Sequence, residues 1–238
     1  MQFWNRLLEL VYPPSCLSCS SRLLEPTPLE LCGACERQIH SVPPPRCPRC
    51  GRHSTISLRD GDACLMCQQA PPLFRAGFAA FEYAATLRDC IHRMKFDSHR
   101  RLGTALGARL AHVAHIHLAT GHYDLVIPVP LHPSRRRDRG FNQAELLAQS
   151  VSRTLGLPLE HRALQRSRRT AAQSRLPADD RQDNVSGAFR VRCAQRIAGR
   201  RLLLVDDVLT TGATANACSQ ALLAAGASSV DVLVLATN

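Results

Sequence analysis

Four Cys-x-x-Cys pairs in the first 67 residues constrain the fold of this chain more than any other feature. Their members are Cys16, Cys19, Cys32, Cys35, Cys47, Cys50, Cys64 and Cys67. Two thiolates at this spacing on a tight turn reach one tetrahedral Zn²⁺, and a second pair completes a four-thiolate site. We therefore predict a double zinc ribbon with structural zinc. Sequential pairing of the motifs is favoured, and interleaved pairing stays open.

Two other interpretations of these cysteines are less favoured. A disulfide framework belongs to exported proteins, and no secretory signal opens the chain, because Arg6 and Glu9 interrupt its apolar residues. Redox chemistry uses one such motif at the start of a helix, not four in a Pro-rich segment. We therefore expect a cytoplasmic protein. Cys90, Cys193 and Cys218 belong to no pair and are expected to be small core or surface residues.

The residues before the first cysteine pair predict a short helix. Its apolar positions share one face and are Phe3, Trp4, Leu7, Leu8 and Val11. We expect this helix to dock on the rest of the protein, with a membrane anchor as the less favoured alternative. No run of about 18 apolar residues occurs, so no membrane span is expected. Pro71 and Pro72 mark the boundary between two predicted domains, residues 1–71 and 72–238.

Beyond this boundary, largely apolar strand patterns alternate with helical patterns. The predicted strands are 74–83, 123–131, 187–192, 201–208 and 229–236, and the predicted helices are 86–96, 100–119, 141–156 and 213–227. Gly156 and Gly226 are the expected ends of the last two helices. This alternation predicts an α/β fold with a parallel sheet covered on both faces. Ligands of such sheets sit beyond the carboxyl ends of the strands.

The stretch LLLVDDVLTTGATANA (202–217) joins one of these strands to a helix. Its two adjacent acids, Asp206 and Asp207, repel each other, which suits a site for hydroxyls or a metal better than a structural strand end. The following loop, 209–214, offers backbone N–H groups at a helix N-terminus, together with threonine hydroxyls. No GxxxxGK[ST] motif occurs, which excludes a nucleoside-triphosphate P-loop. A phosphate cradle beside two carboxylates suits a sugar phosphate with Mg²⁺.

Positive charge is concentrated before this stretch. The chain has a formal net charge of +11, and residues 134–201 hold 16 basic and 6 acidic side chains, a net +10. Such clustering indicates a polyanionic partner. Within it, PVPLHPSRRRDRGFNQ (128–143) is predicted to be a strand end followed by a mobile basic loop, a lid over a polyphosphate. Only Phe141 and Phe189 could stack on bases there, so contacts with the phosphate backbone would dominate binding to nucleic acid.

Together these motifs resemble one known family. LLLVDDVLTTGAT (202–214) looks like the ribose-phosphate binding signature of type I phosphoribosyltransferases. Combined with residues 128–143, with TAAQSRL (170–176), with RQDNVSGAFRV (181–191) and with the four cysteine pairs, it resembles the ComF, or GntX-like, family of competence-associated proteins. The resemblance covers essentially the whole chain. It implies a type I phosphoribosyltransferase-like parallel sheet behind the double zinc ribbon.

The resemblance also implies a ligand, 5-phosphoribosyl 1-diphosphate with Mg²⁺. Asp206 and Asp207, the candidate catalytic pair, would hold the ribose hydroxyls. The 5′-phosphate would be bound by Leu209, Thr210, Thr211, Gly212, Ala213 and Thr214, and the diphosphate by Leu131 and His132 under a lid of Arg135, Arg136, Arg137 and Arg139. Relatives often have a glycine after the KF of MKFDSHRRL (94–102), and its absence here leaves the role of Lys95 open.

Three classes of function are compatible with these features. The favoured one is a ligand-binding protein of natural competence that takes single-stranded DNA on the cytoplasmic side, with a competence helicase or the DNA-uptake machinery as a partner. The alternative is an active phosphoribosyltransferase with an unknown acceptor and no role with DNA. A ligand-sensing regulator ranks last, because the sequence shows no separate reading helix. Binding of the sugar phosphate is better supported than its transfer, since no general base stands out.

Overall fold

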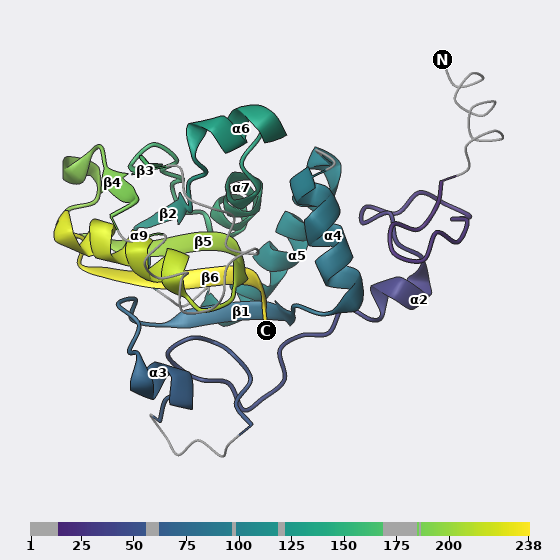
Figure 1. Ribbon diagram of the computed structural model, residues 1–238, viewed down its shortest axis with the longest axis horizontal. Coiled ribbons are helices and arrows are strands. Elements are labelled where there is room, and N and C mark those ends of the chain that lie inside the picture. Colours follow the sequence, from purple (N-terminus) through teal and green to yellow (C-terminus); the bar gives the residue numbers. More distant parts are fainter. Residues whose placement is uncertain (1–13, 56–61, 97–98, 119–121, 169–184, 186) are drawn as a thin grey trace.

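A four-stranded parallel sheet forms the centre of the computed structural model (Figure 1), which describes residues 14–55, 62–96, 99–118, 122–168, 185 and 187–238. The sheet has the strand order β1-β6-β5-β2. Its strands are β1 (Gly77–Glu82), β2 (Leu125–Pro128), β5 (Arg201–Leu209) and β6 (Ser229–Thr237). The predicted helix at the start of the chain, TAAQSRL (170–176) and residues 181–184 and 186 lie outside the described residues.

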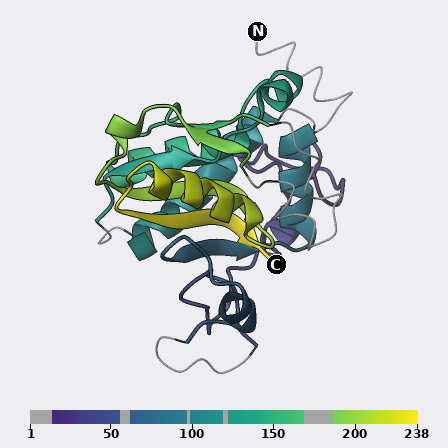
Figure 2. The same ribbon diagram turned by 60° about the vertical axis from the view of Figure 1, so that its left-hand side comes forward.

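The two central strands are buried on both faces over most of their length. Every residue of β6 after Ser229 is buried, and Leu204 of β5 pairs with Val232 of β6. Helices cover both sides, as Figures 1 and 2 show: α4 (Ala85–Phe96), α5 (Arg100–Leu118) and α7 (Gln143–Leu155) lie on one face and α9 (Ala213–Ala224) on the other. Each fully buried Leu or Val contributes about 1.5–3 kcal/mol to the stability. The predicted covered parallel sheet is confirmed.

Helix α7 begins and ends at the residues that the sequence marks. The Asn142 side chain accepts a hydrogen bond from the Ala144 backbone N–H, 3.2 Å away. At the other end Gly156 has a left-handed φ of 67° and caps the helix, as predicted. The Asn142 amide also donates to the Val129 carbonyl, at 3.0 Å, and so ties the start of α7 to the segment after β2.

Two local expectations were wrong. Residues Pro133–Arg139 form helix α6, not a loop, because His132 caps its first turn through Nδ1 and Gly140 ends it at a φ of 78°. The strand predicted at 187–192 exists as β4 (Phe189–Val191), but it pairs antiparallel with β3 (Leu164–Arg166), a strand that the sequence pattern did not reveal.

The cysteine-rich part forms two small ribbons that dock at different places (Figure 1). The first ribbon (residues 14–38), with α2 (Gly33–Glu36), packs on α4 and α5, where Thr86 donates to Gln38 at 2.8 Å. The second ribbon (residues 42–55 and 62–70), with α3 (Leu65–Gln69), lies under the edge strand β1. Elsewhere in the chain, the 3₁₀ turn η2 (Ala194–Arg196) lies between β4 and β5.

The second ribbon touches β1 backbone to backbone. A Cβ added to Gly77 would lie 2.9 Å from the carbonyl carbon and oxygen of Cys50, and one added to Gly51 would lie 2.5 Å from the Gly77 carbonyl oxygen. Gly51 also has a φ of 74°, which side chains rarely adopt. Only glycine at both positions allows this close approach.

The chain between the ribbons covers the outer edge of the sheet. Val42 donates its backbone N–H to the Ala80 carbonyl at 3.2 Å, and Glu82 donates to the His40 carbonyl at 2.9 Å. Residues 40–42 therefore protect β1 as a short antiparallel neighbour.

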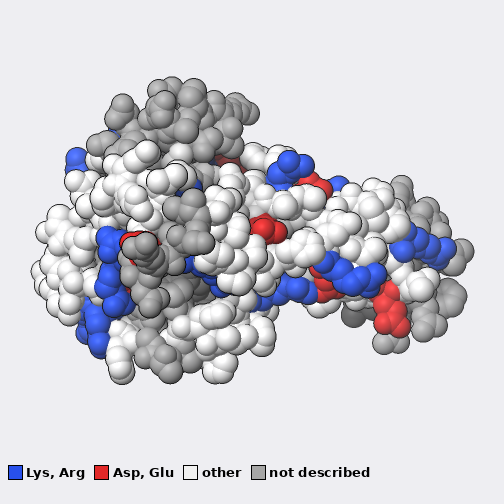
Figure 3. Space-filling view, turned by 90° about the horizontal axis from the view of Figure 1, so that it is seen from below, with Lys and Arg blue, Asp and Glu red and all other residues white. Residues whose placement is uncertain are grey.

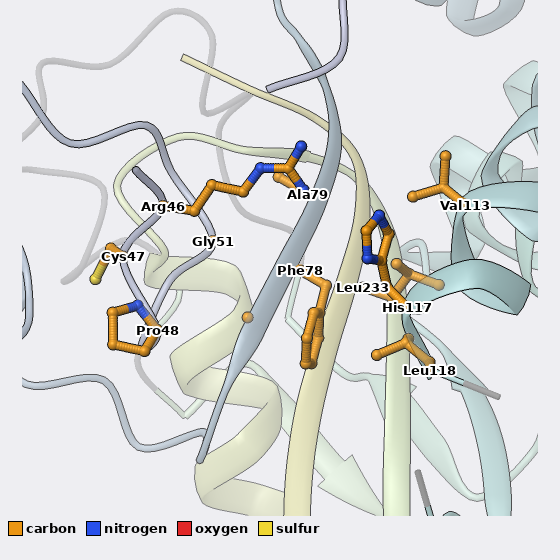
Figure 4. Close-up of a pocket in the computed structure, with 11 residues that line it drawn as sticks. Arg46, Cys47, Pro48, Gly51, Phe78, Ala79, Val113, His117, Leu118 and Leu233 are labelled. Carbon is orange, nitrogen blue, oxygen red and sulfur yellow. The ribbon is translucent and has the colours of Figure 1, made fainter. Parts of the chain in front are cut away.

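An apolar cavity of about 240 Å³ lies where the second ribbon meets β1 (Figure 4). Arg46 and Pro48 of the second ribbon lie on one side of β1, and Val113 and His117 of α5 lie on the other. The cavity is next to the amino-terminal half of β1, away from the acidic pair. We interpret it as a packing gap between the ribbon and α5.

Candidate functional site: an acidic pair facing arginines

The acidic pair stands at the carboxyl end of β5, inside a pocket of about 360 Å³. Asp207 is buried with 4% of its surface exposed, and Lys95 from the last turn of α4 lies 3.0 Å from both of its carboxylate oxygens. Asp206 accepts a hydrogen bond from the Asp207 backbone N–H at 2.8 Å. Both side chains line the pocket, as does Lys95. The structure thus gives Lys95 a position that the sequence left open.

The two carboxyl groups of the pair have different electrostatic surroundings. Burial, and then the neighbouring carboxylate of Asp207, raise the pKa of Asp206 to about 7. Asp207 is held by the ammonium group of Lys95. A divalent cation or the hydroxyls of a sugar would relieve the repulsion between the two carboxylates, which makes the pair a chemically reasonable Mg²⁺ or diol site.

The polar loop after β5 leads into α9. Gly212 has a φ of 83° and caps the helix, and the Thr211 hydroxyl accepts from the Ala213 N–H at 3.4 Å. Thr237 of β6 fixes the loop from below by donating its hydroxyl to the Leu209 carbonyl at 2.9 Å. Loop amides at a helix N-terminus favour an anion.

The loop residues border three adjoining hollows. Those that share the acidic pocket are Thr210 and Thr214. Leu209, Gly212 and Ala213 line a small dent next to it, which also includes Asp206. Thr211 lines neither of these hollows and borders a gap of about 240 Å³ shared with the second ribbon. The predicted phosphate loop is therefore close to the acidic pair on one side and borders the second ribbon on the other, where Leu209, Gly212 and Ala213 line the same gap as Thr211.

Arginines form the wall opposite the acids. Arg135 and Arg139 are four residues apart on α6, so they share one helix face, and both line the pocket with Leu131. Arg139 is half-buried and lies 5.8 Å from the centre of the Phe96 ring. Burial lowers the pKa of Arg139, while the charge of Asp207 opposes that shift. Two guanidinium groups in the same pocket as the acids can receive the charge of a diphosphate.

The other residues predicted for this wall lie elsewhere. His132 caps α6, where its Nδ1 lies 3.2 Å from the Ser134 backbone nitrogen, and it does not line the acidic pocket. Arg136 and Arg137 are exposed and border a different hollow on the far side of α6. The predicted lid of four arginines is thus split between two places, because consecutive residues of a helix point in different directions.

The sequence analysis missed several residues that line the acidic pocket. Arg166, at the end of β3, is only 6% exposed, and burial lowers its pKa. Its guanidinium group lies 5.3 Å from the centre of the Phe189 ring on β4. Tyr83 and Phe96 add aromatic surface, and Gln143 accepts from Arg139 at 2.5 Å. No local signal marks Arg166, which is one of 16 basic residues in its stretch.

The eight paired cysteines form two compact groups. One contains Cys16, Cys19, Cys32 and Cys35, the other Cys47, Cys50, Cys64 and Cys67, and the sulfur atoms of each group lie within 4.8 Å of one another. This is the sequential pairing that the sequence favoured. Hydrogen bonds from the Cys35 backbone and from Ser21 lower the pKa of Cys32 to about 6, which favours the thiolate that zinc binds. The donor set and its closeness fit tetrahedral zinc.

Comparison with known proteins agrees with this arrangement. Residues 7–70 match the family model described as a double zinc ribbon domain. The chain is 36% identical over 208 residues to the DNA utilization protein YhgH of Shigella flexneri, a match that covers 86% of this chain and 89% of that protein. It is 34% identical over 211 residues to competence protein F of Haemophilus influenzae, with 87% and 90% covered.

Solved structures show lower similarity. The structure of the allosteric regulatory enzyme of purine biosynthesis has a TM-score of 0.38 at 22% identity and covers 56% of this chain and 25% of that one. An adenine phosphoribosyltransferase also has a TM-score of 0.38, at 13% identity, and covers 60% of this chain and 74% of its own.

The sheet, the acidic pair and the two cysteine groups define a class of protein: a parallel α/β domain with a loop suited to anions, joined to a double zinc ribbon with structural zinc. Within that class, the chain belongs to the ComF family, which includes competence protein F and the DNA utilization protein YhgH. In the described part of the chain, no helix combines the length and the apolar character that crossing a bilayer requires.

Proposed function

We propose that this protein binds 5-phosphoribosyl 1-diphosphate with Mg²⁺ and acts with single-stranded DNA in the cytoplasm. The observation that carries the proposal is one pocket lined both by the acidic pair, of which Asp207 is buried, and by two arginines of α6. Asp206 and Asp207 would hold the ribose hydroxyls and Mg²⁺, and Arg135 and Arg139 would receive the diphosphate. The amides of the loop 209–214 would receive the 5′-phosphate.

The relatives support the cellular side of this proposal. Their names refer to DNA utilization and to competence. A protein with those roles meets DNA, and the net charge of +10 over residues 134–201 supplies the attraction that a phosphate backbone needs. A competence helicase or another part of the DNA-uptake machinery is the partner that this role would require.

An active phosphoribosyltransferase is the second candidate. It is favoured by the aromatic side of the pocket, where Tyr83 and the 63% exposed Phe96 offer a planar acceptor a surface beside the acids. Transfer would displace diphosphate at the anomeric carbon, and the arginines would stabilise the departing charge. Diphosphate release in the presence of candidate acceptors, compared between the wild type and Phe96→Ala, tests this activity directly.

Calorimetry tests the binding proposal. We expect 5-phosphoribosyl 1-diphosphate to bind the wild type in the presence of Mg²⁺, and Asp206→Ala/Asp207→Ala to abolish binding. Asp138→Ala, an exposed acid on α6, is the control and should bind like the wild type. Unchanged affinity in the double variant would show that the acidic pair does not contact the ligand. Equal affinity with and without Mg²⁺ would show that the metal takes no part in binding the ligand.

A further inference from the structure

Helix α6 presents its arginines to two different hollows. Arg135 and Arg139 line the acidic pocket. Arg136 and Arg137 line a separate hollow of about 570 Å³ on the other side of the helix. Pro130 and Leu131 border both, so the two hollows share the wall formed by the segment after β2. We call the second hollow the Arg137 groove.

The Arg137 groove is basic on both of its walls. One wall is α6 with the segment after β2, and the other is the base of the β3–β4 hairpin, where the Arg192 N–H donates to the Ala163 carbonyl at 2.8 Å. Its basic residues are Arg136, Arg137, His161, Arg162 and Arg192, and all five are exposed. Prolines and two leucines supply the apolar remainder of the lining, and no aromatic side chain except the His161 ring is part of it.

Most of this charge is not neutralised by the protein itself. Arg136 pairs with Glu145 of α7 at 3.2 Å. Within the described residues, no carboxylate lies at ion-pair distance from Arg137, Arg162 or Arg192. Four arginines against one glutamate leave a formal net charge of +3 in the groove with His161 neutral. Unpaired arginines on facing walls are available for an anionic partner.

We propose that the Arg137 groove binds the phosphodiester backbone of single-stranded DNA, outside the sugar-phosphate pocket. The role with DNA rests on the function proposed above, and the location rests on the charges and the lining of the groove. Guanidinium groups on two walls suit successive phosphates of one strand better than a single small anion. A single strand is flexible enough to bring its phosphates to both walls, whereas a duplex is stiff over about 150 base pairs.

The lining also predicts how the DNA is read. Arginines grip phosphates, and without Phe, Tyr or Trp in the groove the bases gain no stacking platform there. Binding is therefore tolerant of sequence and depends strongly on salt. With about three phosphates neutralised, the logarithm of the binding constant should fall with the logarithm of the salt concentration at a slope near −2. Net charge alone does not choose the site, since the face in Figure 3 also carries Lys and Arg side chains.

The test compares two variants that lose the same charge. Arg137→Ala/Arg192→Ala removes one arginine from each wall, and Arg88→Ala/Arg101→Ala removes two exposed arginines from α4 and α5. A fluorescent 20-mer of deoxythymidine is titrated with each protein between 50 and 200 mM salt. Calorimetry with 5-phosphoribosyl 1-diphosphate and Mg²⁺ is run on the same samples, and thermal unfolding verifies that each variant folds.

We expect the groove variant to bind the 20-mer at least about tenfold more weakly. Its salt slope should be less negative by about 1.4, the value for two phosphate contacts to a single strand. The affinity for 5-phosphoribosyl 1-diphosphate should stay that of the wild type, because neither arginine lines the acidic pocket. The control pair should keep the salt slope of the wild type.

Each contrary result has its own meaning. Equal weakening in the control pair would show that net charge, not the groove, attracts DNA, and equal affinity for a duplex of the same length would overturn the single-strand assignment. A wild type that does not bind the 20-mer at 50 mM salt would overturn the role of the groove with DNA. That result would leave the sugar-phosphate proposal intact if calorimetry still detects its ligand, so the two failures are distinguishable.

Discussion

Lys95 and Asp207, 112 residues apart in the chain, form a half-buried ion pair in which the ammonium nitrogen lies 3.0 Å from both carboxylate oxygens. The pair links the end of α4 to the end of β5, and it closes one side of the acidic pocket. The ammonium group of Lys95 therefore lies where a metal ion bound to the acidic pair would carry its positive charge. A metal ion that binds there must compete with it.

The first prediction concerns this competition. Lys95→Met leaves Asp207 buried without its cation, which should lower the free energy of unfolding by about 1–3 kcal/mol and Tm by about 3–8 °C. Adding Mg²⁺ should raise Tm more in this variant than in the wild type, because the metal takes the place of the ammonium group. Thermal unfolding with and without Mg²⁺ measures both effects. Arg88→Met on the same helix is the control, and an equal response of all three proteins to Mg²⁺ contradicts a metal at Asp207.

The second prediction follows from the raised pKa of Asp206. A carboxyl group with a pKa near 7 in the folded state and near 4 in the unfolded state binds protons more tightly when folded. It therefore costs stability as pH rises from about 4 to 7, and the cost is constant above that range. Asp206→Asn removes this cost and keeps the oxygen that accepts from the Asp207 N–H. The variant should be more stable than the wild type by about 1–4 kcal/mol at pH 8.

This advantage should shrink steadily as the pH falls toward 5, which unfolding curves in urea at several pH values would reveal. Asp138→Asn on α6 is exposed and should follow the wild type at every pH. A constant difference between Asp206→Asn and the wild type from pH 5 to 8 would mean that the stability change does not come from titration of this carboxyl group.

The third prediction separates the two zinc sites. The second ribbon shares a gap with the loop after β5, where Cys67 and Thr211 line the same space and the Asn216 side chain of α9 accepts from the Leu73 N–H at 3.0 Å. The first ribbon packs on α4 and α5 instead. Cys64→Ser should therefore weaken binding of 5-phosphoribosyl 1-diphosphate more than Cys19→Ser does.

Metal analysis should find about two zinc ions per chain in the wild type and about one in each cysteine variant. Calorimetry on the same preparations gives the ligand affinity. Equal affinity of the two variants would show that the second ribbon does not support the loop. Wild-type protein without zinc, when purified under reducing conditions, would refute the ribbons.

The fourth prediction concerns the contact between Gly51 and Gly77. Gly77→Ala places a methyl group 2.9 Å from the Cys50 backbone, which cannot rotate away, so we expect a loss of about 1–3 kcal/mol and faster release of zinc to a chelator. Gly33→Ala is the control, because its nearest neighbour is the flexible end of Arg37 at 3.4 Å. If both variants release zinc at the rate of the wild type, the close approach is not needed.

Local patterns were sufficient to predict much of this molecule. The spacing of the cysteines predicts the two four-cysteine groups, because a knuckle turn is set by a few consecutive residues. The apolar runs predict the central strands, and the acids at the end of one run predict the position of the pocket. In each case the necessary information lies within a short stretch of sequence.

The errors concern features that depend on contacts across the chain. Strand β3 has three residues and exists because it pairs with β4, so neither it nor the burial of Arg166 has a local signal. Helix α6 looked like a charged loop because its stability comes from the caps at His132 and Gly140 rather than from an apolar face. That helix also decides which arginines face the acidic pocket, and a run of arginines in the sequence does not carry this information.

The short segment 40–42 has a consequence for how the chain is made. It lies between the two cysteine groups, and its hydrogen bonds with β1 occupy the outer rim of the sheet. Without zinc the groups on either side of it cannot hold their shape, and the rim of β1 becomes a template on which another chain can add a strand. We therefore expect chains made without zinc to aggregate through the exposed edge of β1 before they bind any ligand.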